Sequence, residues 1–260
     1  MRIPIHHVDA FADRRFTGNP AAVCLLPAWL DDTTLQAIAA ENNLSETAFV
    51  VTHAEQPHAL RWFTPTAEVD LCGHATMAAA FVLRALGRAG DELRFATRRA
   101  GTLVVRAQGA QLEIDLPARP AVPLEPVPGL ERALGATVLS TWRAHKCMAV
   151  LADEDAVREL RPDLGFVAAL PYDGLVVTAA GRDVDFVSRY FAPHIGVPED
   201  PVTGSAHCTL VPYWAAQTGM TELRARQLSQ RGGALRCRLA GDRVLLAGGC
   251  MPYLVGEIEV

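Results

Sequence analysis

The sequence has no long apolar run. No segment approaches the roughly 18 apolar residues that a membrane-spanning helix needs. The first eleven residues, MRIPIHHVDAF, contain no apolar stretch of the length found in signal peptides. We therefore expect a cytoplasmic protein that does not bind a membrane.

Paired cysteines, concentrated basic charge and the common cofactor motifs are also missing. The six cysteines are widely spaced and none forms a CxxC pair, which argues against a zinc site or a disulfide framework. The net charge is -5, and the densest basic stretch, residues 224–236, is interrupted by apolar residues and glycines. A nucleic-acid partner is not expected, because phosphate binding needs a concentrated basic face. No GxxxxGK[ST], strand-borne GxGxxG or HExxH motif is present, so we predict neither an organic cofactor nor a metal.

Short β-type runs bounded by Gly, Pro, Asp and Asn fill most of the chain. They lie at residues 2–12, 47–53, 60–64, 92–97, 102–107, 112–116, 138–142, 148–151, 175–178, 184–190, 223–228, 234–239, 244–247 and 254–260. Residues 33–42 and 153–160 show helical spacing, whereas residues 74–86 and 205–217 form helical patterns that are apolar on nearly every face. A helix that is apolar all round must be buried all round. The pattern predicts an α+β fold with two sheets, each rolled around one buried helix.

The chain divides into two similar halves. Residues 117–128 are dense in proline and cannot form a helix or a central strand, so we interpret them as a connector. We expect one domain at residues 1–118 and a second at residues 119–260, with one buried helix in each. This arrangement indicates an internal duplication.

The two buried helices begin with similar sequences. An acid, a short spacer and a glycine precede each one: Asp70 and Gly73 before the first, Asp200 and Gly204, followed by Ser205, before the second. Unpaired backbone N–H groups and the helix dipole make a helix start a ready anion site. The alternative is that Asp70, Asp200 and Ser205 only cap their helices.

Three further residues near the first helix start have two interpretations each. His74 fits a structural role in a buried helix as well as a catalytic one, and Cys72 fits a small buried apolar group or a helix-start thiolate. Glu46 lies at a loop–strand junction, where it is either a surface group or, inside a dry cleft, a base whose pKa desolvation would raise.

Four stretches identify the chain as resembling the PhzF, or phenazine biosynthesis-like, family. They are residues 8–20, residues 43–47 (Asn-Leu-Ser-Glu-Thr), residues 70–76 (Asp-Leu-Cys-Gly-His-Ala-Thr) and residues 188–207, which end in Glu-Asp-Pro-Val-Thr-Gly-Ser-Ala-His. A weaker match covers residues 227–233. Together they span nearly the whole chain in order.

The resemblance implies the diaminopimelate-epimerase-like fold: two domains, each a mixed sheet rolled into a barrel around a central helix, with the active site between them. It also implies that the last strand crosses to the amino-terminal domain. The activity implied is a cofactor-free, metal-free isomerase that shifts a proton on a small carboxylate-bearing substrate, often as a homodimer. By motif match the catalytic residues are Glu46, His74 and Asp200. Substrate-binding candidates are Asn19, Cys72, Gly73, Gly204 and Ser205, with Asn43 and Gly232 as further lining candidates.

One position departs from the family pattern. The enzyme that gives the family its name lacks a cysteine at the position of Cys72, whereas epimerases and racemases of the same fold use two facing thiols. No cysteine lies between Asp200 and Ser205, and Cys208 is expected to point into the core. Three functions therefore stay open: a Glu46-dependent isomerase, an amino- or hydroxy-acid epimerase that uses Cys72 as one base, and a binding protein without catalysis.

Overall fold

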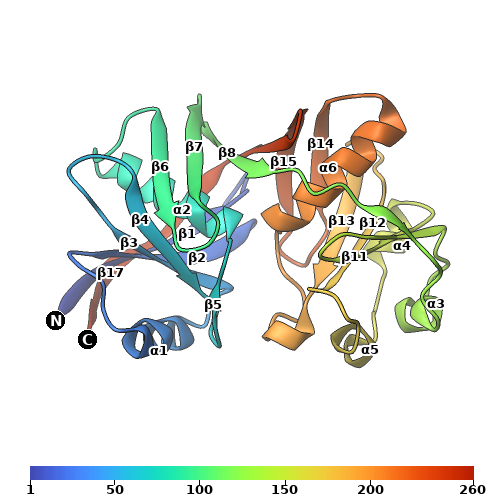
Figure 1. Cartoon of the computed structure of the whole chain (residues 1–260), viewed down its shortest axis with the longest axis horizontal. Coiled ribbons are helices and arrows are strands. Elements are labelled where there is room, and N and C mark those ends of the chain that lie inside the picture. The colour runs from blue at the N-terminus through green and yellow to red at the C-terminus, as the bar shows by residue number, and fades with distance from the viewer. The chain divides into compact units, whose positions relative to one another are not determined.

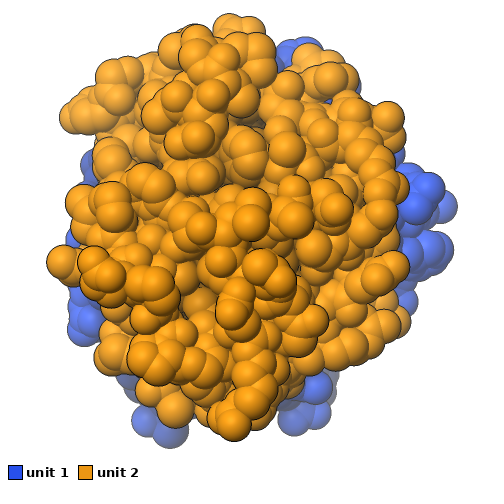
Figure 2. Space-filling view, turned by 90° about the vertical axis from the view of Figure 1, so that its right-hand side faces the viewer, with its two compact units in different colours: residues 1–116, 247–260 blue, residues 117–246 orange.

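The computed structural model describes residues 1–260 and divides them into two compact units, coloured separately in Figure 2. Unit 1 comprises residues 1–116 and 247–260, and unit 2 comprises residues 117–246. The last strand, β17 (Cys250–Glu259), belongs to unit 1, where it pairs antiparallel with β1 (Arg2–Ala10) from Arg2↔Glu259 to Ala10↔Cys250. None of the helices has the length and apolar character required to cross a membrane.

Unit 1 is a mixed sheet with the strand order β17-β1-β2-β3-β4-β6-β7-β8 (Figure 1). The β2–β3 and β4–β6 pairs are parallel and the other pairs are antiparallel. The remaining elements are β2 (Asn19–Leu26), α1 (Asp32–Asn42), β3 (Glu46–Val51), β4 (His58–Phe63), β5 (Glu68–Val69), α2 (Gly73–Ala85), β6 (Glu92–Thr97), β7 (Thr102–Gln108) and β8 (Gln111–Pro117). Parallel neighbours need a crossover connection, which α1 and α2 provide.

Unit 2 repeats this order. The β11–β12 and β13–β14 pairs are parallel, and each is joined through helices. Its elements are β9 (Val122–Leu124), α3 (Leu130–Leu134), β10 (Ser140–Arg143), β11 (Cys147–Val150), α4 (Glu154–Arg158), α5 (Leu164–Ala168), β12 (Leu175–Ala180), β13 (Phe186–Phe191), the 3₁₀ turn η1 (Pro193–Ile195), α6 (Gly204–Thr218), β14 (Glu222–Gln227), β15 (Gly233–Ala240) and β16 (Arg243–Gly248), whose last residues belong to unit 1. The two units thus share one topology: parallel pair, antiparallel strand, buried helix, parallel strand.

The buried helices are α2 and α6. Nearly every residue of α2 is buried, and the helix contacts β1, β2, β3, β7 and β17. In α6 the indole of Trp214 stacks on Phe186, with ring centroids 5.8 Å apart, and donates to the Thr178 hydroxyl at 2.9 Å. Helix α2 is therefore buried on almost all sides, and α6 is buried over most of its length but exposed at its last three residues.

Pro212 lies inside α6 and has no N–H to donate to the carbonyl four residues earlier. That carbonyl, of Cys208, instead accepts from the backbone N–H of Arg119 at 2.8 Å. The proline-rich connector thus supplies the hydrogen bond that the helix lacks, and Pro212 is accommodated within a buried helix.

The sequence patterns missed several elements, of which β2 is the most important. Pro20 is its second residue and pairs with Asp9, a place near the strand start where the missing N–H is tolerated. The pattern also missed the short β5, β9, α3 and α5, and β9 shows that the connector contains one three-residue strand. The pairings establish a mixed sheet around a buried helix in each unit; they do not establish the predicted closed barrel.

A buried arginine–glutamate pair occupies the same place in each unit. Arg61 of β4 forms a bidentate salt bridge with Glu68 (Nε–Oε1 2.7 Å, Nη2–Oε2 2.8 Å). Arg189 of β13 forms the same kind of salt bridge with Glu199 (Nε–Oε1 2.7 Å, Nη2–Oε2 3.0 Å). The arginine side chains are 5% and 9% exposed. Glu68 lies five residues before Gly73, the first residue of α2, and Glu199 lies five residues before Gly204, the first residue of α6. The acids that correspond in the two units are therefore Glu68 and Glu199, and the alignment of Asp70 with Asp200 was wrong.

We expect Glu199→Gln to lower the free energy of unfolding by about 2–3 kcal/mol, because it leaves the buried Arg189 guanidinium without its counter-charge. The matched control is Asp70→Asn. Asp70 pairs with Arg99, but the side chains are 62% and 70% exposed, so its loss should cost under about 1 kcal/mol. Urea unfolding measures both variants, and equal losses would contradict the assignment of the pair as an anchor.

Candidate functional site

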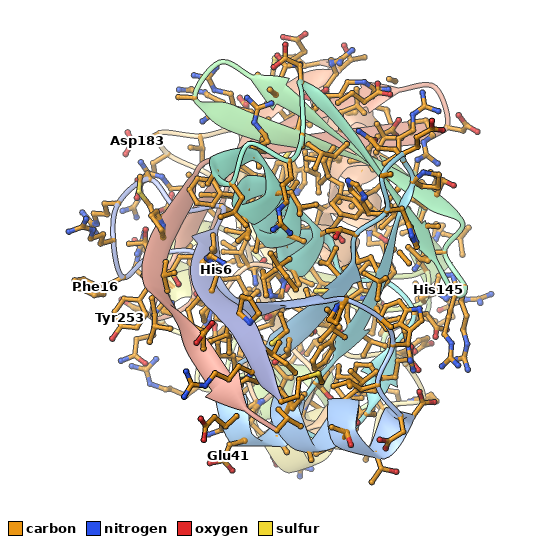
Figure 3. The ribbon with its side chains drawn as sticks, turned by 90° about the vertical axis from the view of Figure 1, so that its left-hand side faces the viewer. His6, Phe16, Glu41, His145, Asp183 and Tyr253 are labelled. Carbon is orange, nitrogen blue, oxygen red and sulfur yellow. The ribbon has the colours of Figure 1, made fainter.

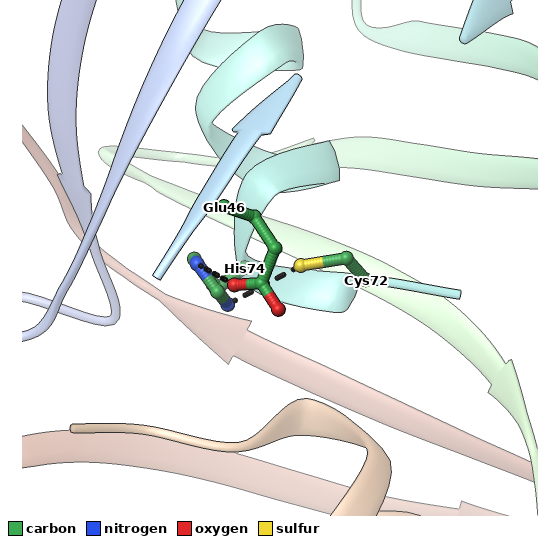
Figure 4. Close-up of side chains that lie close together, drawn as sticks. All are labelled: Glu46, Cys72 and His74. Atoms are coloured by element: carbon green, nitrogen blue, oxygen red, sulfur yellow. Dashed lines mark hydrogen bonds and ion pairs between the residues drawn. The ribbon is translucent and has the colours of Figure 1, made fainter. Parts of the chain in front are cut away.

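Four polar side chains gather at the start of α2 in unit 1. Asn19 and Glu46 are the first residues of the parallel neighbours β2 and β3, with Ala21 opposite Glu46. Cys72 immediately precedes α2, and His74 is the second residue of that helix. We call Asn19, Glu46, Cys72 and His74 the Glu46 cluster; Figure 4 shows the last three.

The local sequence explains how Glu46 reaches this place. Helix α1 ends at Asn43, which adopts a left-handed conformation (φ 47°) and donates its N–H to the Ala39 carbonyl. Asparagine is one of the few residues that tolerates this conformation. The chain then turns through Leu44 and Ser45 directly into β3. Asn43 therefore acts in ending the helix and is not part of the cluster.

The imidazole of His74 is the centre of the cluster. Its Nε2 lies 3.2 Å from Glu46 Oε2, and its Nδ1 lies 3.1 Å from Asn19 Nδ2 and 3.4 Å from Cys72 Sγ. The ring also forms a hydrogen bond with the Pro20 carbonyl. The side chain of His74 is 4% exposed and that of Glu46 is 15% exposed. The cluster is thus a buried histidine with one partly accessible carboxylate beside it.

Burial lowers the pKa of His74 to about 3, against a weaker opposing effect of the hydrogen bond with Pro20. The ring is therefore neutral at physiological pH. Nδ1 lies within hydrogen-bond distance of the Asn19 amide, whereas Nε2 faces Glu46 without forming a hydrogen bond. A ring whose pKa is lowered in this way is a poor base toward the neighbouring Cys72 thiol.

The donor atoms of Glu46, Cys72 and His74 all lie within 4.8 Å of one another. A carboxylate, a thiolate and an imidazole are ligands that zinc accepts. The Nδ1 of His74 already hydrogen-bonds with Asn19, whereas its Nε2 has no hydrogen-bond partner. The spacing of cysteines along the sequence could not reveal this grouping, because its members come from three separate elements.

The start of α2 has no side-chain cap, and neither has the start of α6. By contrast, Asp31, Asp153 and Asp163 cap α1, α4 and α5. Asp70 is mostly exposed and binds Arg99, so the alternative that it caps α2 is wrong. The first N–H groups of a helix have no partner within the helix, and at these two helices they are available to an anion.

A second polar group surrounds the start of α6 in unit 2. The Thr203 hydroxyl donates to the carboxylate of Asp200, whose own N–H donates to the Tyr190 carbonyl at 3.0 Å. The Gln227 amide accepts from the Thr203 N–H at 2.9 Å and donates to the Asp200 carbonyl at 2.7 Å. Asp200 is 7% exposed. We call Asp200, Thr203, Gly204, Ser205 and Gln227 the Asp200 cluster.

The N-cap residue of α6 is Thr203, whose side chain forms no cap hydrogen bond, and Ser205 lies inside the helix as its second residue, so the alternative that Ser205 is the cap is wrong. Cys208 is buried within α6, with its Sγ 3.6 Å from the Gly204 carbonyl, and burial raises the pKa of its thiol to about 11. The expectation that Cys208 points into the core is confirmed.

The structure therefore places the predicted residues in two groups. Asn19, Glu46, Cys72, Gly73 and His74 meet in unit 1, and Asp200, Gly204 and Ser205 meet in unit 2. Sequence reasoning missed Thr203 and Gln227. The signal was present, because both lie in segments that carry the family resemblance. Gly232 donates its N–H to Ser229, whose hydroxyl donates to the Pro201 carbonyl, so its segment supports the Asp200 loop.

Comparison with known proteins gives consistent results. A family model described as "Phenazine biosynthesis-like protein" matches residues 8–253. An uncharacterized isomerase of Pseudomonas aeruginosa is 50% identical over 261 residues, covering 100% of both chains. A crystal structure of a PhzF-family phenazine biosynthesis protein from Enterococcus faecalis is 43% identical and covers 100% of both chains with a TM-score of 0.96.

A more distant structure shares the fold alone. A hydroxyproline epimerase from Agrobacterium vitis matches with a TM-score of 0.64 at 10% identity, covering 99% of this chain and 92% of its own. The fold is thus one found in both phenazine biosynthesis-like proteins and epimerases.

We predict that the His74 ring stays neutral from pH 8 down to pH 5. The folded pKa of about 3 lies below the unfolded value of 6.5. Protons therefore favour the unfolded chain, and this ring lowers the free energy of unfolding as the pH falls from 6.5 toward 3. Two-bond ¹H–¹⁵N spectra of the histidine rings, assigned with His74→Gln, measure the protonation state. An imidazolium pattern for His74 at pH 6 would refute the prediction.

Proposed function

The chain belongs to the phenazine biosynthesis-like family, and from this premise we propose that it is an isomerase that shifts a proton on a small carboxylate-bearing substrate, without a cofactor. Glu46 is the general base and then the general acid. The observation that carries the proposal is the partly accessible Glu46 carboxylate held against the neutral ring of His74 beside an uncapped buried helix.

The proposed reaction conserves its atoms. The Glu46 carboxylate takes a proton from one carbon of the substrate, so that a C–H bond breaks and an O–H bond forms. The Glu46 carboxyl group then gives a proton to another carbon as the double bond moves, and exchange of its O–H with water between the two steps lets solvent deuterium enter the product. Negative charge that develops between the two steps is stabilised by the backbone N–H groups at the start of α2, around Gly73.

His74 has a narrower role in this scheme than the sequence suggested. A ring with a pKa of about 3 does not accept a proton readily at neutral pH. Its Nε2 lies 3.2 Å from Glu46 Oε2, and we assign the ring to packing against the carboxylate and limiting its orientations. Asn19 in turn fixes the ring. Between the two transfers the proton is therefore held by Glu46, whose partly accessible carboxyl group exchanges it with water, and not by His74.

The Asp200 cluster supplies further polar contacts in the proposal. The hydrogen bonds from Thr203 and Gln227 fix the Asp200 loop. Ser205 is partly exposed at the helix start, and the N–H groups of Gly204 and Ser205 precede the first intrahelical bonds. We assign these groups to binding the polar parts of the substrate. Self-association, expected from the family, fits the exposed Phe16 and Tyr253 side chains on unit 1 (Figure 3).

The test is substrate-dependent uptake of deuterium from heavy water into a panel of small carboxylates, followed by mass spectrometry. We expect Glu46→Gln to lower the exchange rate by at least about 10²-fold, the lower range for loss of a general base. Glu41→Gln is the matched control, because Glu41 is an exposed carboxylate of α1 in the same unit (Figure 3). Full exchange in Glu46→Gln would sink the proposal. Absence of exchange by the wild type on every candidate would favour a binding protein.

The second candidate is an epimerase that uses Cys72 as one base. The Sγ of Cys72 is 3.4 Å from His74 Nδ1, within the same cluster. The neutral ring is a poor base toward this thiol, however, so the isomerase assignment predicts that Cys72→Ala retains exchange within about tenfold of the wild type. Loss of exchange in Cys72→Ala, together with protection of Cys72 from a thiol reagent by the same carboxylate, would establish the epimerase instead.

A further inference from the structure

The chain contains a single lysine, Lys146, among its 24 lysine and arginine residues. Every other strongly basic side chain is an arginine. Lysine is among the residue types that are almost never fully buried without a partner. Lys146 is nevertheless only 7% exposed. The one lysine of the protein therefore lies where a lysine is least expected.

The strand pattern places Lys146 on the α6 side of the unit 2 sheet. It directly precedes β11, in which Cys147 and Ala149 pack into the core cluster that includes residues of α3, α4 and α5. Side chains alternate along a strand, so Lys146 points to the opposite face. That face is covered by α6, as the hydrogen bond from Trp214 to Thr178 shows.

Lys146 also lies at the end of the sheet where α6 begins. Its Nζ is 5.3 Å from the centroid of the Tyr190 ring. Tyr190 is near the end of β13, and its carbonyl accepts from the Asp200 N–H. The charged groups that act on Lys146 are Asp173, Arg119, Cys208 and Asp200, all in unit 2. The ammonium is thus beside the Asp200 cluster.

No carboxylate is hydrogen-bonded to this ammonium; its charged neighbours act on it only through space, and burial lowers its pKa. The two buried arginines behave differently, because Arg61 and Arg189 each fork onto a glutamate. A buried cation without a paired anion is costly. Its retention next to a helix start with open N–H groups points to an anion that arrives with a ligand.

We propose that Lys146 binds a carboxylate of the substrate, with the backbone N–H groups of Gly204 and Ser205 as neighbouring donors. This inference rests on the proposed function only in assigning the anion to the substrate. It makes Lys146 a specificity-determining residue, because a compact ammonium selects an anionic group and the aromatic ring of Tyr190 fixes its direction of approach. Neutral esters and amides of the same shape should bind more weakly than the carboxylate, since they leave the buried charge of Lys146 unpaired.

A single lysine makes the test direct. Protein labelled with ¹⁵N and ¹³C in lysine gives one side-chain signal, which belongs to Lys146. The probes are oxalate and succinate at constant ionic strength, with succinamide as the neutral control and inorganic phosphate as the competing anion. We expect a carboxylate probe, and not succinamide, to shift the Lys146 signal and raise its pKa.

Variants complete the test. Lys146→Met should weaken binding of the carboxylate probe by roughly tenfold or more, the loss of one charge-assisted hydrogen bond. Arg143→Met is the matched control, because Arg143 is an exposed cation on the preceding strand, and it should leave binding within about twofold. Should Lys146→Met fail to fold, the titration of the wild-type signal decides alone. A Lys146 signal that no carboxylate moves, a response to phosphate only, or unchanged binding in folded Lys146→Met would overturn the inference.

Glu46→Gln separates this inference from the proposed function. If that variant loses deuterium exchange but still shows the Lys146 shift, both assignments stand. If the wild type binds the carboxylate at Lys146 but exchange does not depend on Glu46, the isomerase proposal fails and the anion site remains.

Discussion

The forked pairing of a buried arginine with a glutamate is the interaction on which both polar clusters depend. Arg61 and Arg189 lie in corresponding strands, and each holds the glutamate that stands five positions before a buried helix. The chain between that glutamate and the helix carries Cys72 in one unit and Asp200 and Thr203 in the other. Two parallel N–H···O bonds fix direction as well as distance, so the loops reach their helices in a defined conformation.

Burial has opposite consequences for the basic groups of the two clusters. In unit 1 it keeps the His74 ring neutral, which in the proposed reaction leaves proton transfer to Glu46. In unit 2 it leaves Lys146 beside open helix N–H groups with no paired carboxylate, which favours an arriving anion. Under the two proposals, desolvation thus leaves proton transfer to a carboxylate and anion binding to an ammonium.

The sequence predicted the two buried helices and many residues of the two polar clusters. The predictions that were wrong or missing each have a specific physical cause. The all-apolar segments predicted both buried helices, and the motifs predicted Glu46, His74 and Asp200. Strand β2 was missed because it contains Pro20, and a proline argues against a strand when only the sequence is known. Asp70 was matched to Asp200 because sequence spacing cannot tell an exposed acid bound to Arg99 from a buried one. Thr203, Gln227 and Lys146 were missed because their roles depend on contacts between separate strands and helices.

The hydrogen bond from the Arg119 N–H to the Cys208 carbonyl attaches the proline-rich segment to helix α6. A second bond, from the Ala118 N–H to the Asp242 carbonyl at 2.8 Å, lies one residue earlier. Both positions follow directly after β8, which ends at Pro117. A segment that resembles a flexible spacer by composition is therefore fastened to unit 2 from its second residue onward. The segment is thus part of the ordered structure of unit 2 and not a free linker.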